Sequence, residues 1–337
     1  MQAEVIKKEK EFNIFDKIIN VVKKYIKDNA GILVGFVTLC VVLSIISDAF
    51  FTKDNILNVL RQASVNANLA VGMTLALIIG GIDLSVGSIL GLSGTVTAGL
   101  IAINNIPVAP AVLIGLSLGT FLGFVNGKII AKTGMPPFIV TLAMMQIARG
   151  IAYVYTGGMP IRVMHDQFNF LGNGYLGFMP LPIIYSLILM LGVGYVLSKT
   201  KLGRHIYALG GNIDAARFSG IKIGNIQIFV HTLIGFLAGF TGIVLCARMY
   251  SGQPSVGSGY EMDAIAAAVL GGTSFTGGIG RIGGTLIGVL VIAVLNNGLN
   301  LLNVNSFWQL IVKGVVILVA VYFDMTKKKK SLNQKNA

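Results

Sequence analysis

A succession of long apolar stretches constrains this chain more than any other feature of its sequence. About 20 mostly apolar residues are enough for a helix to cross the hydrocarbon core of a bilayer. Hydrophobic residues make up 54% of the 337 positions and charged residues only 12%, against roughly 25% charged residues in soluble domains. The sequence therefore predicts an all-α polytopic membrane protein. About ten transmembrane helices are expected, at residues 30–46, 56–79, 84–103, 108–131, 138–155, 181–197, 226–249, 263–270 with its neighbours, 282–302 and 307–323.

Basic residues gather at one end of the predicted spans. If the N-terminus is cytoplasmic, 20 of the 26 Lys and Arg residues lie on the inner side of the membrane. An excess of Lys and Arg in short cytoplasmic loops is the usual rule for such proteins. We therefore expect both termini to be cytoplasmic and the number of crossings to be even. The net charge of +13 is then explained by membrane topology and lipid, without a nucleic-acid partner.

Both ends of the chain are basic, and neither belongs to the predicted transmembrane domain at residues 30–326. Apolar residues interleave with lysines over residues 1–29, which predicts an amphipathic helix on the inner surface of the membrane. A disordered basic tail is the alternative for this segment. Residues 327–337 are expected to form a basic cytoplasmic tail.

Residues 199–222 form the only long polar and charged insert between apolar stretches, and residues 199–225 are the predicted cytoplasmic loop. Two short amphipathic helices are expected in this loop. Gly210, Gly211 and Asn212 would form the break between them, because Gly and Asn commonly end helices. Such a loop, held in water between two spans, is suited to docking a partner.

Polar side chains also occur within the predicted spans. They are costly at membrane depth unless they line a cavity, pair with one another or mark a pathway, although hydrogen bonding between helices explains any single one equally well. Asp83 follows two glycines and is expected to cap the next helix by accepting from backbone N–H groups near Val86, with direct solute contact as the alternative. The candidate path residues are Gln62, Asn66, Asn68, Asp83, Ser85, Ser88, Asn296, Asn297 and Asn300.

A glycine-rich stretch at residues 271–281 follows a short apolar segment and predicts a second interrupted helix. Interrupted helices at membrane depth are tolerated only against protein or a water-filled path, so the breaks at Gly80 and Gly271 indicate a transport route. The chain has no G-x-x-x-x-G-K-[ST] motif for ATP, no catalytic triad and no metal-ligand cluster in its sequence. We therefore expect no catalysis, no cofactor and no metal in this chain.

Several stretches are specific enough to indicate a family. They are GIDLSVGS (81–88), KLGRHIYALGGN (201–212), AARFSGI (215–221), GYEMDAIAAAVLGGTSFTGGIGRIGGTLIG (259–288) and LNNGLNLL (295–302). Together they resemble the permease subunit of bacterial ribose-type ABC sugar importers. The similarity runs over residues 50–324, and related permeases with similar motifs carry other monosaccharides such as galactose or xylose.

The resemblance implies a homodimeric permease of the type II importer architecture in the bacterial inner membrane. An ABC ATPase that holds ATP and Mg would lie below it and an extracytoplasmic sugar-binding protein outside, and the imported solute would be a monosaccharide, foremost D-ribose. The residues implied in coupling to the ATPase are Lys201, Leu202, Gly203, Arg204, Asp214, Ala215, Ala216 and Gly220.

Three basic residues, Lys53, Arg162 and Arg248, are expected on the outer side and are candidates for pairing with acids of the binding protein. A secondary carrier or channel that needs neither ATP nor a partner is the alternative function. It would usually need more ionisable groups at the membrane midplane than this sequence shows.

Overall fold

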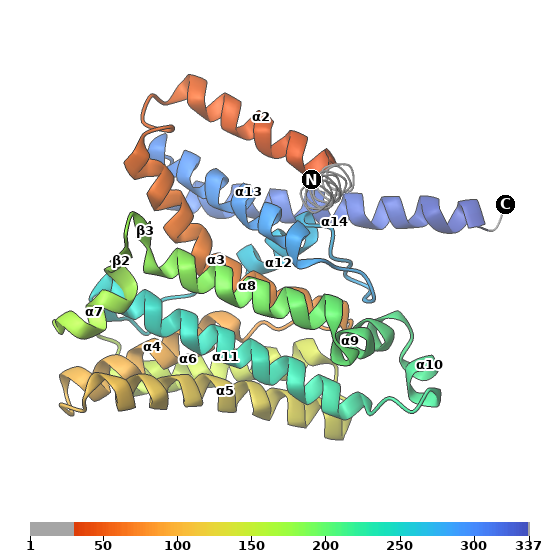
Figure 1. Cartoon of the computed structure of the whole chain (residues 1–337), viewed down its shortest axis with the longest axis horizontal. Coiled ribbons are helices and arrows are strands. Elements are labelled where there is room, and N and C mark those ends of the chain that lie inside the picture. The colour runs from red at the N-terminus through yellow and green to blue at the C-terminus, as the bar shows by residue number, and fades with distance from the viewer. Residues whose placement is uncertain (1–29, 336–337) are drawn as a thin grey trace, which may run out of the picture.

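The structure is a computed structural model that describes residues 30–335, with the backbone alone at residue 320 and residues 323–335. The predicted amphipathic segment at residues 1–29 lies outside this range. Helices dominate the described part (Figure 1). They are α2 (Ala30–Ile46), α3 (Lys53–Ile78), α4 (Val86–Ala102), α5 (Val108–Thr133), α6 (Pro137–Thr156), α7 (Asp166–Asn173), α8 (Leu181–Lys199), α9 (Lys201–Gly211), α10 (Ile213–Phe218), α11 (Ile223–Met249), α12 (Tyr260–Leu270), α13 (Ile282–Leu301) and α14 (Ser306–Lys335).

The two ends of the helical bundle differ (Figure 1). One end holds α7 and four two-residue strands, β1 (Ile161–Arg162), β2 (Tyr175–Leu176), β3 (Met179–Pro180) and β4 (Ser251–Gly252). β1 pairs with β4 and β2 with β3, both antiparallel. The opposite end holds α9 and α10, and both the start of α2 and the far end of α14 point toward it. The predicted cytoplasmic loop and the ends of the described chain thus share one end of the bundle.

Ten helices fall on the ten predicted spans. Among residues 30–335, five of them are long and apolar enough to cross a membrane, namely α5, α6, α8, α11 and α13. α2, α4 and the apolar part of α14 are shorter apolar helices, α3 has 26 residues but a polar first half, and α12 has 11 residues. The structure supports a helical polytopic membrane protein, and the count of about ten crossings stays a prediction.

The span at α12 is half helix and half irregular backbone. At 1.5 Å per residue its 11 residues reach about 16 Å, roughly half of the bilayer core. Gly272, just after the helix, has φ +84°, a left-handed conformation that glycine adopts without strain. Residues 271–281 continue toward α9, where Gly278 N donates to the Ile78 carbonyl (2.8 Å). α3, α9 and α13 lie against this segment, as membrane depth requires of irregular backbone.

α5 and α11 pack backbone against backbone through glycines. A Cβ added at Gly119 or Gly123 of α5 would come closer than 3.0 Å to backbone atoms of α11, and one at Gly235 of α11 would meet Gly123. Small residues allow membrane helices to approach this closely, and the stability then comes from van der Waals contact. Glycines therefore set the close approach of this helix pair.

We predict that Gly123→Ala lowers the stability of the folded protein, because the added methyl group overlaps the His231 carbonyl oxygen of α11. Overpacking of this kind costs about 1–3 kcal/mol, which should appear as a lower Tm in detergent. Gly150→Ala on α6 is the matched control, since nothing lies within 4 Å of its added carbon. Equal Tm values for the two variants would contradict this account of the packing.

Candidate coupling face and transport cavity

The predicted cytoplasmic loop consists of α9 and α10, which meet at Asn212. Thr200 caps α9 by accepting a hydrogen bond from Gly203 N (3.1 Å), and Asn212 caps α10 by accepting from Ala215 N (2.9 Å). The expected pair of short helices is confirmed. The break is narrower than expected, because Gly210 and Gly211 still belong to α9 and only Asn212 leaves it.

The residues implied in ATPase coupling divide into an exposed and a buried set. The exposed set is Lys201, Arg204, Asp214, Ala215 and Gly220, and the half-buried or buried set is Leu202, Gly203 and Ala216. A Cβ at Gly203 would overlap the Leu197 carbonyl of α8, so Gly203 fixes how α9 leaves α8. Asp214 pairs with Arg217 at 3.7 Å on the open surface of α10. The charged members of this set, Lys201, Arg204 and Asp214, therefore all face outward.

Two apolar side chains on α10 were not among the predicted coupling residues. Phe218 is 90% exposed and Ile213 is 43% exposed. Large apolar groups left open on a polar loop mark a contact surface when they lie together. In the sequence, the signal that could have indicated this surface was a Phe within an otherwise polar insert. We call the exposed surface of α9 and α10 the candidate coupling face, and both residues lie on it.

α9 lies directly against both breaks in the membrane helices. A Cβ at Gly210 would overlap the carbonyl oxygen of Ile78, close to the break at Gly80. Gly277, in the second break, lies against Gly210, and a Cβ at Gly277 would also approach Gly80 N. The sequence predicted the two breaks but not that they meet beneath α9.

A hydrogen bond joins α9 to the second break as well. The Tyr207 hydroxyl donates to the Gly280 carbonyl oxygen (2.7 Å). Burial raises the pKa of Tyr207, while the positive charge of Arg281 lowers it by a smaller amount. The net shift is upward, so the hydroxyl keeps the proton that it donates. α9 thus contacts residues 271–281 through both a hydrogen bond and its backbone.

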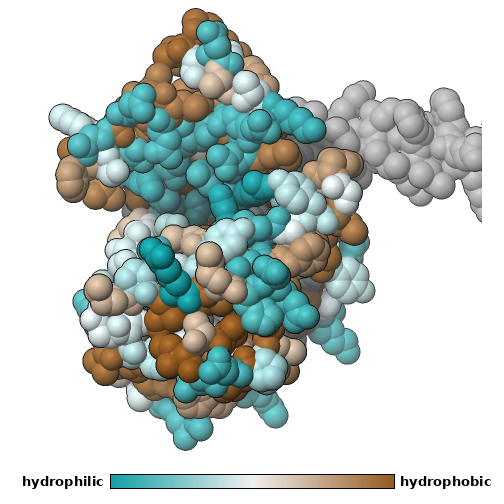
Figure 2. Space-filling model, turned by 90° about the vertical axis from the view of Figure 1, so that its left-hand side faces the viewer, coloured by the Kyte–Doolittle hydropathy of each residue, from teal (hydrophilic) through white to brown (hydrophobic). Residues whose placement is uncertain are grey.

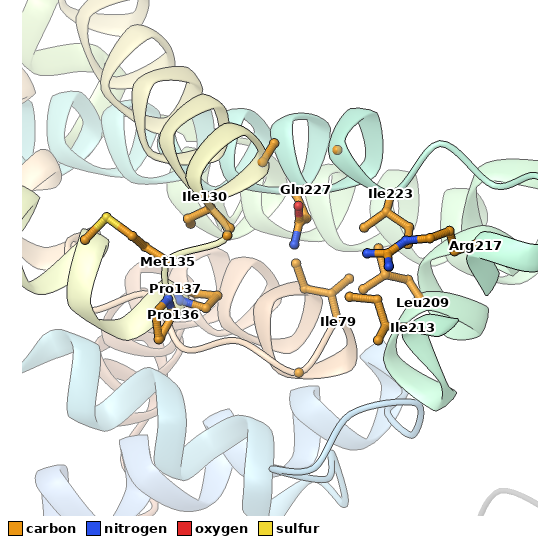
Figure 3. Close-up of a pocket in the computed structure, with 14 residues that line it drawn as sticks. Ile79, Ile130, Met135, Pro136, Pro137, Leu209, Ile213, Arg217, Ile223 and Gln227 are labelled. Carbon is orange, nitrogen blue, oxygen red and sulfur yellow. The ribbon is translucent and has the colours of Figure 1, made fainter. Parts of the chain in front are cut away.

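A hollow of about 600 Å³ opens beside α9 and α10 (Figure 3). Its walls come from the ends of α3 and α5, the start of α6, both loop helices and the start of α11. Most of the side chains are apolar, and Arg217 and Gln227 are its polar members. The hollow leaves α10 room to move toward the bundle.

A second, polar cavity of about 380 Å³ lies toward the other ends of α3 and α11. Four of the predicted path residues line it together: Gln62, Asn66, Asn296 and Asn300. The polar cavity and the first hollow are far apart along α3. Asn66 lines the cavity and Ile79 lines the hollow, and at 1.5 Å per residue these two positions are about 20 Å apart. The other polar residues of the cavity are Arg248, Tyr260, Asp263, Gln309 and Lys313.

An ion pair at the wall of this cavity was not predicted. Lys313 Nζ of α14 lies 2.9 Å from Asp263 Oδ2 of α12. The Asn296 side chain of α13 donates to the same oxygen at 3.4 Å. The three residues come from three different helices, so no spacing in the sequence indicated that they meet. They tie α12, α13 and α14 together at the cavity.

The remaining path candidates do not line the polar cavity. Asn297 is buried and exchanges two hydrogen bonds with the Asn55 side chain (2.7 and 3.0 Å), which joins α13 to α3. Asn68 and Ser88 are also buried within the bundle. Asn297 therefore joins two helices by hydrogen bonding.

Asp83 and Ser85 belong to a buried polar cluster rather than to a simple helix cap. Asp83 Oδ1 accepts from the backbone N of Ser85 (2.9 Å), directly before Val86, as predicted, and it also accepts from Ser85 Oγ (2.5 Å). Asp83 Oδ2 lies 2.9 Å from His231 Nδ1 of α11, and Asn126 of α5 donates to Ser85 Oγ (3.0 Å). The contact between His231 and Asp83 was not predicted, because the two residues are far apart in the sequence. The cluster fastens the start of α4 to α5 and α11.

The end of the molecule that carries α7 and β2–β3 is seen face-on in Figure 2. Hydrophilic residues spread across the middle of this face, with apolar residues exposed below them. Lys53 and Arg162 are exposed. Arg248 is half-buried and lines the polar cavity, so the structure places it with the path candidates rather than with the other two docking candidates.

Comparison with known proteins gives consistent matches over most of the chain. A family model described as the branched-chain amino acid transport system / permease component matches residues 55–321. The ribose import permease protein of Escherichia coli strain K12 is 49% identical, covering 88% of this chain and 93% of that protein. The ribose import permease protein of Bacillus subtilis strain 168 is 46% identical over 88% and 92%. The D-allose transport system permease protein of E. coli K12 is 40% identical over 83% and 86%. No solved structure matches.

The helical bundle, with a polar cavity inside it and a loop that contacts its interrupted helices, fits the class that these matches indicate, a multi-pass membrane permease component of a transport system. The chain belongs to the family of transport-system permease components that this family model describes. The resemblance to permeases of ribose-type importers is confirmed by the relatives.

We predict that His231→Ala strongly destabilises the protein, because it leaves the Asp83 carboxylate buried without its partner on α11. Removing one member of a buried pair costs about 3–5 kcal/mol, so the Tm and the yield of monodisperse protein should both fall. Asp214→Asn removes a charge from an exposed pair and is the control, with little expected effect. A Tm for His231→Ala equal to that of the control would show that the buried contact is dispensable.

We predict that Gly210→Ala impairs transport while Gly211→Ala does not. The first substitution places a methyl group on the Ile78 carbonyl and pushes α9 away from both breaks, whereas the second meets nothing within 4 Å. Both positions lie in the last turn of α9, so the change in helix propensity is the same. Solute uptake per folded transporter is the measurement. Equal uptake by the two variants would argue against force transfer through Gly210.

Proposed function

We propose that this chain is the membrane-spanning permease subunit of an ATP-binding cassette importer for a monosaccharide, foremost D-ribose. The contact of α9 with both glycine breaks carries the proposal. It connects a surface that can receive a partner to the interrupted part of the membrane domain. Identities of 49% and 46% to two ribose import permease proteins support ribose as the solute.

The chain itself supplies no chemistry in this mechanism. ATP and Mg are held by a separate ATPase, which pushes on the coupling face of α9 and α10 when it closes. Tyr207 and Gly210 pass the displacement to residues 271–281 and to the end of α3. Glycines with positive φ at Gly80, Gly272 and Gly277 let these segments turn. Their rearrangement joins the polar cavity to the cytoplasmic end.

The remaining partners follow from the two ends of the bundle. A sugar-binding protein docks on the end that carries α7 and the strands, where Lys53 and Arg162 are exposed. The ATPase docks at the opposite, cytoplasmic end, toward which both ends of the described chain point. Two copies of the permease form a dimer in the inner membrane. Exposed apolar side chains on α2, α5, α6 and α8 face lipid or the second copy.

A secondary carrier is the second candidate, and two buried contacts favour it. Asp83 with His231 and Asp263 with Lys313 place ionisable groups inside the bundle, where proton or ion carriers use such groups. The sequence alone had suggested fewer ionisable groups inside the membrane domain. The coupling face and the relatives favour the importer over the carrier.

Reconstitution of the purified protein distinguishes the two functions. We predict that ribose enters proteoliposomes only when ATP, the co-purifying ATPase and the sugar-binding protein are all present. A permease without coupling-ion transport has no energy source of its own, so the isolated chain should give no accumulation. Accumulation driven by a proton or sodium gradient in the absence of ATP would establish the carrier instead. An empty-vesicle sample and a Gly210→Ala sample are the controls.

A further inference from the structure

The polar cavity concentrates side chains that suit hydroxyl groups. Five carboxamide side chains line it: Gln62, Asn66, Asn296, Asn300 and Gln309. Each carboxamide offers two N–H donors and a carbonyl acceptor, and a hydroxyl group both donates and accepts. Its volume of about 380 Å³ falls within the range of about 300–1,000 Å³ that is usual for small-molecule sites.

Several of these amide groups have no partner among the residues that the structure describes. The side chains of Gln62 and Asn66 form no hydrogen bond within residues 30–335. Asn296 Oδ1 is buried and has no partner among the same residues. A polar group without a partner costs free energy, which a ligand can recover by hydrogen bonding to it. By contrast, Asn300 already accepts from Gln309 (2.9 Å).

The ion pair sets the orientation of Asn296. Asp263 Oδ2 accepts from Lys313 and from the Asn296 amide nitrogen. The Asn296 donor is therefore engaged, and its oxygen remains as an acceptor. Asp263 and Lys313 also neutralise each other, so the pair adds no net charge to the cavity. Arg248 of α11 contributes further N–H donors to the same cavity.

We infer that this cavity is a saturable sugar-binding site of the permease itself, which selects a neutral monosaccharide independently of the sugar-binding protein. The inference rests on the proposed function and goes beyond it, since a passive gate needs only a wet path. Gln62, Asn66 and Asn296 contact the hydroxyl groups. Asp263 and Lys313 are positioning residues that hold the Asn296 amide.

Equilibrium binding of radiolabelled D-ribose to the purified permease in lipid nanodiscs, without ATPase or binding protein, tests the inference. We expect saturable binding that excess unlabelled ribose displaces. Gln62→Ala and Asn296→Ala should each weaken it roughly three- to tenfold, the effect of one or two lost hydrogen bonds. Gln62→Ala should leave the fold intact, because this side chain forms no hydrogen bond within residues 30–335. Weaker ribose binding by this variant therefore reports on the site and not on folding. Asn225→Ala, an exposed position at the start of α11, is the control and should bind like the unaltered protein.

Two results would overturn the inference. One is non-saturable ribose retention that Gln62→Ala and Asn296→Ala leave unchanged. The other is tighter binding of ribose 5-phosphate than of ribose, which would assign the cavity to anions through Arg248. Ribose import by the complete transporter is measured in parallel. This second measurement allows the importer function and the binding site to be judged separately. If import proceeds while the isolated permease fails to bind, the binding site is refuted and the importer function stands.

Discussion

Irregular backbone inside a membrane protein must find its hydrogen bonds within the protein, and this constraint organises the structure. Residues 271–281 leave helical geometry below α12, and α3 ends at Ile78, just before Gly80, beside them. Gly278 N bonds to the Ile78 carbonyl (2.8 Å), and Ser274 N bonds to the Ile279 carbonyl (2.9 Å). Without these contacts the segment could not lie at membrane depth. α9 covers the same segment, so the contact that completes the fold is also the contact through which a partner can act on it.

The positions of the two hollows explain why a partner would have to act on this segment. The polar cavity and the hollow beside α10 lie toward opposite ends of α3 and α11. Between them every residue of α3 from Ala63 to Ile78 is buried, and the hydroxyls of Thr74 and Thr285 bond to each other (2.7 Å) across α3 and α13. A solute can pass this packed layer only if α3, α12 or α13 moves. The glycine breaks lie at the ends of α3 and α12, where such a movement can begin.

Local patterns predicted the helices well and predicted the contacts between them poorly. Apolar run length located the ten helices, and glycine clusters located both breaks, because each of these signals lies within a short stretch of chain. Four amide residues placed in the path by polarity do share one cavity. Asn297 did not join them, since its partner Asn55 lies on another helix. His231 and Lys313 were missed for the same reason, because a buried pair depends on which helices are neighbours.

The two buried ionic contacts differ in a way that decides their roles. Asp83 and His231 are fully enclosed, and their other neighbours, Ser85 and Asn126, complete a closed cluster between helices. Burying such groups costs solvation energy. Here the cluster holds α4, α5 and α11 in a fixed junction. Asp263 is equally buried, but Lys313 keeps 24% of its side chain exposed beside the polar cavity. A charge pair with one member still in contact with the cavity can respond to what enters it. The enclosed pair therefore belongs to the scaffold, and the pair at the cavity wall belongs to the sugar site that we propose.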